Sequence, residues 1–345
     1  MKKLIRLAAI LLCVATLFSF VACSGNSGKE TETTTKSIET TTGTPDRENK
    51  MKIVALKGPT GMGMLKLSVD RTYAYDVSFV SNPTEIVSMI STGEVDIAAC
   101  PLNLAATLYK KTNGGVQMLA INTLGVLSIL ENGNSIKSIA DLKGKTIYAT
   151  GQGSTPEYIL NFVLSENGIN PETDVKIEYI ADHSELAAKA AADEVSLVML
   201  PEPHVSTVLN KNTKFRKAVS MTAEWDAVCA KKGIDSTLAQ GCLVVRTDYA
   251  KENPELISEF LDFYEMSINY VRNETTKKLA AIFLYEQKFL PSADIALACI
   301  DGSNLAFIIG EEMMNIAKQN LSVLYEANPA SVGGALPDES FYYIP

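Results

Sequence analysis

Two glycine-rich turns contain the residues best suited to hold a small molecule. Gly58-Pro59-Thr60-Gly61 follows the apolar run 51–56, and Gly151-Gln152-Gly153-Ser154-Thr155 follows the run 146–149. A helical pattern begins after each turn, and free backbone N–H groups at the start of a helix bind an anion or a carbonyl. The hydroxyl groups of Thr60 and Ser154 add a hydrogen-bonding group to each turn. We expect both turns to contact a ligand.

The first turn lacks the sequence of a nucleotide-binding loop. A P-loop needs Lys-Ser/Thr after its second glycine, because the lysine reaches the phosphates and the hydroxyl holds magnesium. Gly58 and Gly63 have the required spacing, but Met64 and Leu65 follow them. The dinucleotide pattern fails as well, since Lys66 occupies the place of its third glycine. The turn can hold a small molecule but carries no catalytic chemistry.

Polar residues near the ends of other predicted strands extend the candidate site. Asn103 offers both a donor and an acceptor, and Glu202 lies between two prolines that stiffen its backbone, so that it suits an amine or a ring N–H. Three alternatives stay open: Cys100 as a buried small hydrophobe, Glu202 as an exposed turn carboxylate, and Trp225 as a residue that closes the second domain. The additional candidates are Ser81, Asn82, Cys100, Pro101, Asn103, Asn122, Glu202, His204 and Trp225.

Metal and covalent chemistry are not indicated. His183 and His204 are the two histidines, and neither an H-x-x-H pattern nor a zinc-like cysteine pair accompanies them. Cys229 and Cys242 form a disulfide or stay buried free thiols; both alternatives remain open. No G-x-S-x-G motif occurs. We therefore expect no metal, no cofactor and no enzymatic activity.

Alternating strands and helices must position these residues. Such alternation is typical of βαβ units and parallel sheets. We expect strands at 52–56, 76–80, 95–99, 146–149, 175–180, 195–200, 218–221 and 243–246, and a longer extended stretch at 117–130. We expect helices at 62–69, 102–109, 156–166, 184–192 and 204–210, and a further helix that begins at Pro83. Asn82 should cap the helix that begins at Pro83, and Thr155 the helix that begins at Pro156.

The alternation occurs twice, so the folded part has two α/β domains. A polar, turn-rich segment at 138–145 separates the two runs. We predict a first lobe of residues 51–135 plus 246–345 and a second lobe of residues 136–245. The C-terminal third reads as helical from Pro254 and should pack on the first lobe, with an aromatic tail at 341–343 docked against it.

The N-terminus reads as a lipoprotein signal. A basic head and an apolar run at 7–22 precede Cys23, so residues 1–23 are predicted as a signal peptide and Cys23 as the lipidated residue. The alternative is cleavage near Ala22, which would release a soluble secreted protein. Residues 24–50 lack large apolar side chains and are predicted to be a disordered tether. The net charge of −9, without a basic stripe, argues against a nucleic-acid partner.

These features together resemble a known family. The segments "SIADLKGKTI", "ADLKGKTIYATGQGST", "LPEPHV" and "VGGALPDESFYY" are similar to segments in the substrate-binding lipoproteins of ABC importers, in the branch that includes nitrate, sulfonate, taurine and thiamine-pyrimidine binders. The resemblance implies two Rossmann-like lobes of the type II periplasmic-binding-protein fold, with the ligand in the cleft between them. It also implies a monomer on the extracytoplasmic face of the cell membrane that delivers its ligand to an ABC permease.

The ligand class is less well defined. None of the candidate residues is an arginine, which disfavours strongly charged oxyanions. A heteroaromatic vitamin precursor fits Glu202 and Asn103, and a sulfonate held by helix N-termini is the other candidate. One alternative function is a ligand-sensing lipoprotein that presents its cleft to a receptor. Another is an enzyme like the thiamine-pyrimidine synthases, which the lack of a cysteine cluster disfavours.

Overall fold

The computed structural model describes residues 50–345 except 71 and 73. The described residues belong to one compact unit, Thr44–Pro345. The predicted signal peptide with Cys23, and the predicted tether up to residue 49, lie outside the described residues. Within the described part, none of the helices has both the length and the apolar character that a membrane span needs.

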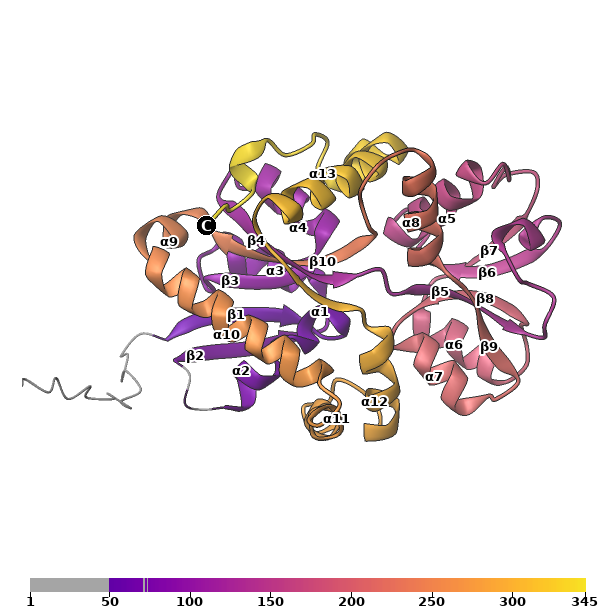
Figure 1. Cartoon of the computed structure of the whole chain (residues 1–345), viewed down its shortest axis with the longest axis horizontal. Helices are drawn as coiled ribbons and strands as arrows, with labels where there is room; N and C mark the ends of the chain where they lie inside the picture. Colours follow the sequence, from indigo (N-terminus) through magenta and orange to yellow (C-terminus); the bar gives the residue numbers. More distant parts are fainter. Residues whose placement is uncertain (1–49, 71, 73) are drawn as a thin grey trace, which may run out of the picture. The chain divides into compact units, whose positions relative to one another are not determined.

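Lobe 1 is built on a mixed sheet of six strands in the order β11-β4-β10-β3-β1-β2 (Figure 1). Strand β1 pairs in parallel with β2 on one side and with β3 on the other, whereas β10 runs antiparallel to both β3 and β4. Their bounds are β1 Met51–Leu56, β2 Tyr75–Val80, β3 Ile97–Pro101, β4 Val116–Leu124, β10 Ala239–Arg246 and β11 Leu305–Ile308. Predicted strands at 52–56 and 76–80 are confirmed almost to the residue.

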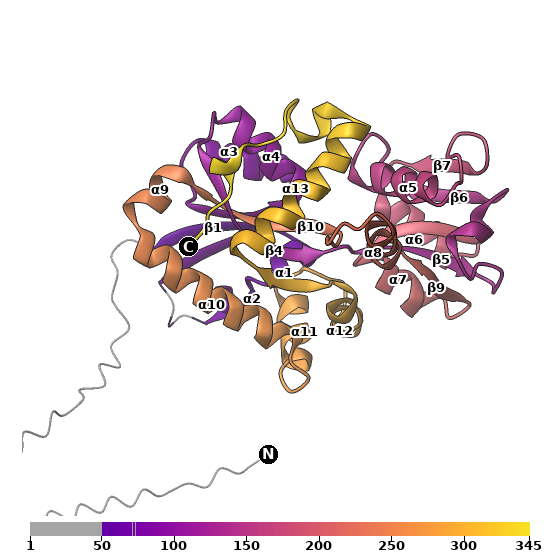
Figure 2. The same ribbon diagram turned by 45° about the horizontal axis from the view of Figure 1, so that its top comes forward.

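Helices cover both faces of the lobe 1 sheet, and each face has its own apolar core (Figures 1 and 2). One core includes side chains from α2 Leu65–Val69, α10 Pro254–Arg272, α11 Lys277–Glu286 and α12 Ala293–Gly302. The other includes side chains from α3 Pro83–Ser91, α4 Leu102–Lys111 and α13 Gly310–Ala327. Two short helices, α1 Pro59–Met62 and α9 Thr247–Glu252, complete the lobe. The C-terminal helices pack on lobe 1, as predicted.

Lobe 2 has five strands in the order β7-β6-β8-β5-β9. Helices α5 and α8 contribute to one core, and α6 and α7 to the other, so this sheet is also covered on both faces. The bounds are β5 Leu127–Asn132, β6 Thr146–Thr150, β7 Lys176–Ile180, β8 Leu197–Pro201, β9 Phe215–Ser220, α5 Thr155–Glu166, α6 His183–Ala191, α7 His204–Lys211 and α8 Met221–Lys231. The two predicted α/β domains are therefore present.

The chain changes sheets at different residues from those predicted. Strand β4 ends at Leu124 in the first sheet and β5 begins at Leu127 in the second, so the extended stretch predicted at 117–130 is two strands. On the way back, β10 already belongs to the first sheet from Ala239. The expected boundaries at 135 and 245 consequently fall inside lobe 2 and at the end of β10. The reason is physical. The first crossing, residues 125–126, is too short to carry a clear turn signal, and the second, residues 232–238, does not show in its sequence which sheet the following strand joins.

The C-terminal tail is docked, as expected. Phe341 and Tyr342 are buried, and the backbone N–H of Tyr343 donates to the carbonyl of Met118 at 2.9 Å. The tail thereby reaches β4. Short 3-10 turns at Pro329–Val332 and Glu339–Phe341 lead the chain there from the end of α13.

Candidate functional site

The first glycine turn is a short helix that follows β1. Gly58 has a φ of 111°, and its carbonyl accepts hydrogen bonds from the N–H groups of Gly61 (3.0 Å) and Met62 (3.2 Å). Because φ is positive, a side chain at position 58 would be strained. The expected helix at 62–69 is divided into α1 and α2, and the turn itself forms α1.

Asn122 lies directly beneath this turn. Its side chain is 1% exposed and donates to the Thr60 carbonyl (3.0 Å) and to the Tyr264 hydroxyl (2.9 Å). A Cβ atom added at Gly241 would lie 2.8 Å from Asn122 Oδ1 and 2.9 Å from Thr60 Oγ1. The three residues are therefore packed against one another. In this structure Asn122 positions the Thr60 turn, while its predicted contact with a ligand stays a prediction.

The other candidates of lobe 1 also lie at the ends of their strands. Asn82 caps α3, because its Oδ1 accepts from the Thr84 N–H at 3.0 Å, which confirms the predicted cap. Pro101 ends β3, and Ser81 follows β2. Asn103, in the first turn of α4, donates to the Ser331 carbonyl at 3.4 Å and so contacts the C-terminal region as well.

The cysteines of the described part are free and buried. Cys229 belongs to a core of lobe 2 and Cys242 to a core of lobe 1, so these two do not form a disulfide here. Cys100 faces Cys242 across the β3–β10 pair, and the Cys242 thiol lies 3.6 Å from the Cys100 carbonyl oxygen. Cys100 therefore occupies the position of a buried small hydrophobe.

The second glycine turn follows β6 in lobe 2. Gly151 and Gly153 have φ angles of 80° and 72°, and Ser154 Oγ donates to the Gly151 carbonyl at 2.6 Å. Helix α5 begins at Thr155 with Ser154 as its N-cap residue, and no side chain caps it. The predicted cap at Thr155 is wrong, because the helix starts one residue earlier than expected and Thr155 is already inside it. Uncapped N–H groups leave room for an external acceptor.

Side chains from both lobes hold this second turn. Glu157 Oε2 accepts from the Gly153 N–H at 2.5 Å, and the Tyr158 hydroxyl donates to the Gly153 carbonyl at 2.9 Å. Asn328, which follows α13 in lobe 1, donates to the same Tyr158 hydroxyl at 2.8 Å. The turn is thus linked to lobe 1 through Tyr158.

Glu202 lies in the contact between lobe 2 and helix α12 of lobe 1. The residue is 5% exposed, so the alternative of an exposed turn carboxylate is wrong. Its Oε2 accepts from the Ser206 N–H at 3.0 Å, and a Cβ atom added at Gly302 would lie 2.1 Å from Oε1. Burial raises the pKa of the Glu202 carboxyl, and hydrogen bonds from Ser206 and the charge of Lys217 offset part of that rise.

A hollow of about 450 Å³ adjoins Glu202. It is lined by residues of α7 and β9 in lobe 2 and of α12 in lobe 1, with Lys217 and Asp301 among them. Figure 1 shows α12 beside α7, in agreement with their contacts. A larger hollow of about 830 Å³ lies elsewhere, beside Gly93, Gly115 and Arg246, and none of the predicted site residues lines it.

His204 lies beside His183, a residue that also follows a predicted strand but is not among the predicted ligand-binding residues. His204 begins α7, and its ring lies 5.4 Å, centroid to centroid, from the ring of His183, which begins α6. Burial lowers the pKa of both imidazoles, that of His204 to about 4 with added repulsion from His183. The signal available in the sequence was position, because His183 follows a strand just as His204 does.

Trp225 belongs to the core of lobe 2. It is 1% exposed and its ring packs on that of Phe162 at 4.7 Å. The two alternatives were a residue that stacks on a ligand and a residue that closes the second lobe. The position of Trp225 in this structure agrees with the second, and its predicted contact with a ligand stays a prediction. Its indole N–H has no hydrogen-bond partner within the described residues.

Solved structures share this two-lobed fold. An ABC transporter protein from Parabacteroides distasonis has a TM-score of 0.71 at 21% identity, with 86% of this chain and 98% of that chain covered. The periplasmic aliphatic sulphonate binding protein SsuA from Escherichia coli has a TM-score of 0.66 at 17% identity, with 86% and 92% covered. The alkanesulfonate-binding protein SsuA from Xanthomonas axonopodis pv. citri, bound to MOPS, has a TM-score of 0.56 at 15% identity, with 84% and 94% covered.

These likenesses define the class: a two-lobed α/β protein of the type II periplasmic-binding-protein fold. The family model described as "ABC transporter, phosphonate, periplasmic substrate-binding protein" matches residues 64–255, more than half of the chain. The chain belongs to this family of substrate-binding components of ABC transporters. No curated protein matches the sequence. The resemblance stated from the sequence is confirmed.

Proposed function

We propose that this chain is an extracytoplasmic, lipid-anchored protein that captures a small organic nutrient between its lobes and delivers it to an ABC permease. One observation carries the proposal: each lobe places a glycine turn at the carboxyl end of a strand, Gly58–Gly61 after β1 and Gly151–Thr155 after β6. Ligands of open α/β sheets bind beyond such strand ends. Membership in a family of periplasmic substrate-binding proteins supports the same function.

We infer that the cargo is a sulfonate-like or phosphonate-like organic anion, with a heteroaromatic vitamin precursor as the second candidate. The uncapped start of α5 and the hydroxyl group of Thr60 offer hydrogen bonds without a full positive charge, and the Ser154 hydroxyl shapes the second turn by donating to the Gly151 carbonyl. A carboxylate at Glu202 would favour a cargo with an amine or a ring N–H. However, this carboxylate already accepts a hydrogen bond from the Ser206 N–H and lies against Gly302. That engagement favours the anion.

The test is a thermal-shift screen of the purified protein with sulfonates, phosphonates, pyrimidines and amino acids, followed by titration of the best compound. Thr60→Val and Ser154→Ala should each weaken binding by about 1 kcal/mol, since the first removes a hydrogen bond to the cargo and the second removes the bond to the Gly151 carbonyl that shapes the binding turn. Ser165→Ala, an exposed serine near the end of α5, is the matched control and should bind normally. Normal binding by both test variants, with unchanged melting, would place the cargo elsewhere.

The lipid anchor has its own test. Cys23→Ala removes the thiol that would carry the lipid, so the variant should stay unprocessed or leave the membrane fraction. Fractionation of cells and the mass of the mature N-terminus measure both outcomes. An unchanged mass and an unchanged membrane fraction would contradict lipidation at this cysteine without affecting the proposed cargo site.

A further inference from the structure

The chain has two histidines, and the fold brings them together. The rings of His183 and His204 are 5.4 Å apart between centroids, with an angle of 37° between their planes. Both rings are half-buried. Each belongs to the first residue of a helix, α6 and α7 respectively.

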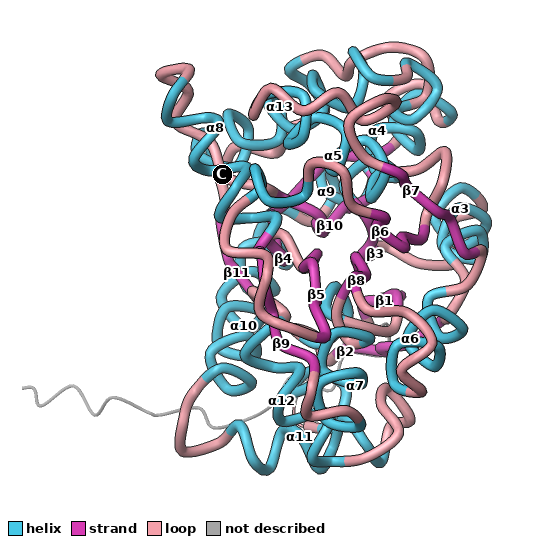
Figure 3. The backbone as a smooth tube through the Cα atoms, turned by 90° about the vertical axis from the view of Figure 1, so that its right-hand side faces the viewer, coloured by secondary structure: helices cyan, strands magenta, loops and turns pink. Residues whose placement is uncertain are grey.

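The order of strands explains why they meet. In the sheet of lobe 2, β6 lies between β7 and β8. Helix α6 follows β7 and helix α7 follows β8, while Thr150 is the last residue of β6 between them. Neighbouring strands are about 4.8 Å apart, so side chains that lean inward from the two outer strands meet beyond the end of the middle one. Figure 3, which is viewed from the lobe 2 side, shows β7, β6 and β8 in this order.

Thr150 orients one of the two rings. Its side chain is 1% exposed, and its Oγ1 lies 2.5 Å from Nδ1 of His183. In the tautomer in which Nδ1 carries the proton, the ring donates to the threonine oxygen and Nε2 keeps its lone pair. Histidines that bind metals usually have their second nitrogen held by an oxygen in this way, which fixes both the tautomer and the ring orientation.

The spacing of the rings also fits a shared ion. An imidazole nitrogen binds zinc at about 2.0–2.1 Å, and the ring centre lies about 1.1 Å beyond it, so two imidazoles in tetrahedral positions have centres about 5 Å apart. The observed separation of 5.4 Å is close to that value. The nearby carboxylate of Asp182, the N-cap residue of α6, adds a negative charge that favours a cation.

We propose that His183 and His204 form a two-imidazole site for a late first-row divalent cation, such as Zn²⁺, Ni²⁺ or Cu²⁺, which imidazole nitrogens bind well. Within the described residues, no group of three or more His, Cys, Asp and Glu side chains is placed to hold a metal. A structural zinc site needs four protein ligands. The protein therefore supplies two ligands, and the remaining positions are open to water or to donor atoms of the cargo.

The nature of the cargo follows from the open positions. An ion held by two side chains binds best when a chelating molecule fills the rest of its coordination sphere, so the site is suited to a small anionic chelator that arrives with its metal. This statement about the cargo rests on the proposed function, whereas the metal site itself does not.

The experiment is a zinc titration of the EDTA-treated protein, measured by calorimetry and by NMR of the imidazole nitrogens. Because the chain has two histidines, the spectrum contains two rings. We expect one ion per chain and simultaneous shifts of both rings. His183→Gln and His204→Gln should each weaken zinc binding at least tenfold, and Thr150→Val, which removes the oxygen behind His183, by about tenfold.

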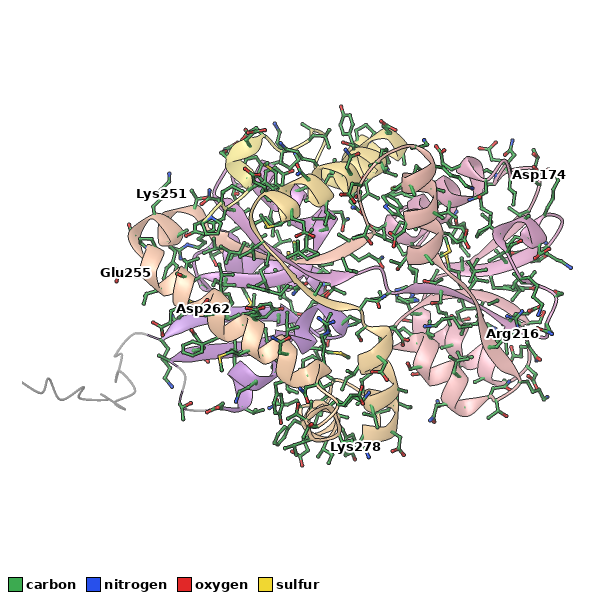
Figure 4. The ribbon with its side chains drawn as sticks, in the orientation of Figure 1. Asp174, Arg216, Lys251, Glu255, Asp262 and Lys278 are labelled. Atoms are coloured by element: carbon green, nitrogen blue, oxygen red, sulfur yellow. The ribbon has the colours of Figure 1, made fainter. Side chains whose placement is uncertain are left out.

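Asp262→Asn is the control for weak binding of zinc to surface carboxylates, and its zinc affinity should equal that of the parent protein. Asp262 is exposed on α10, and Figure 4 shows it on lobe 1, away from lobe 2. If the protein does not bind zinc, the proposal is overturned. It is also overturned if neither histidine variant lowers the affinity for zinc, and that result would show that thiols or carboxylates bind the ion. If the compound screen then finds a cargo that binds without metal, the proposed function stands and the metal site alone is wrong.

Discussion

Glu202 is a carboxyl group whose ionisation opposes folding. Its pKa is raised by burial, so the folded chain holds the proton more tightly than the unfolded chain does. The resulting cost is absent below the unfolded pKa of a glutamate, grows as the pH rises towards the raised folded pKa, and is constant above it. Glu202→Gln removes this cost and keeps an oxygen that can accept from Ser206. The variant should therefore melt at a higher temperature than the parent protein at about pH 8, and the difference should shrink at about pH 4.

The measurement is thermal unfolding of both proteins across that pH range. Glu326→Gln, an exposed glutamate at the end of α13, serves as the control and should follow the parent protein at every pH. A stabilisation by Glu202→Gln that is the same at both ends of the range would show that ionisation is not its source.

Single residues were predictable where local chemistry determines them. The cap at Asn82 and the glycines with positive φ at 58, 151 and 153 follow from rules that involve a few neighbouring positions. The surroundings of Asn122 and Trp225 could not be predicted in this way, because they depend on partners far along the chain, such as Tyr264 and Phe162. For Glu202 the sequence left ligand contact and an exposed turn carboxylate open, and its burial depends on helix α12, about 100 residues further along the chain.

At the scale of elements, the contact between α12 and lobe 2 depends on a glycine. A Cβ atom at position 302 would lie 2.1 Å from Glu202 Oε1. Gly302→Ala should therefore force α12 and Glu202 apart and lower the free energy of unfolding by about 1–3 kcal/mol, the usual cost of overpacking. Denaturant unfolding measures the change.

A double-mutant cycle identifies the cause. In a Glu202→Ala background the clash is removed, so Gly302→Ala should cost much less than it does in the parent protein. An equal cost in the two backgrounds would mean that the end of α12 tolerates no side chain for another reason, and the contact with Glu202 would then carry no weight.

Most elements could be predicted, because hydrophobic alternation and helix caps are local signals. The strands at 146–149 and 175–180 and the helices that begin near 83, 102 and 156 appear within a few residues of their expected bounds. Helix α8 was missed because its apolar residues lack a strong periodic stripe. The division at Gly125 was missed because residues 117–130 read as one extended stretch, and only the pairing of β4 with β10 and of β5 with β8 reveals two strands.

At the scale of the whole molecule, the chain crosses between the lobes twice, at residues 125–126 and at residues 232–238, and the two crossings meet at Gly125. Its carbonyl accepts hydrogen bonds from Thr222 of lobe 2, at 2.9 Å, and from Asn304 of lobe 1. A Cβ atom there would lie 2.2 Å from Thr222 Oγ1 and 2.7 Å from Leu238 Cδ2, in the second crossing. Gly125→Ala should act as a wedge between the crossings, lower stability by about 1–3 kcal/mol and change the radius of gyration of the cargo-free protein.

Small-angle scattering measures that radius, and Gly168→Ala provides the comparison. Gly168, just after α5, has a φ of 75° with open space around an added Cβ atom, so alanine there strains the backbone without touching either crossing. It should lower stability and leave the radius unchanged. If Gly125→Ala also leaves the radius unchanged, the orientation of the lobes is set elsewhere.

The return of the chain to lobe 1 also governs the order in which the protein can be assembled. Strand β10 lies between β3 and β4 in the sheet, yet it is synthesised after all of lobe 2. A nascent chain that has not yet reached residue 239 has the edges of β3 and β4 unpaired, while lobe 2 already has every strand it needs. Unpaired strand edges attract other chains, so partly made or partly exported molecules are the ones that most need a chaperone.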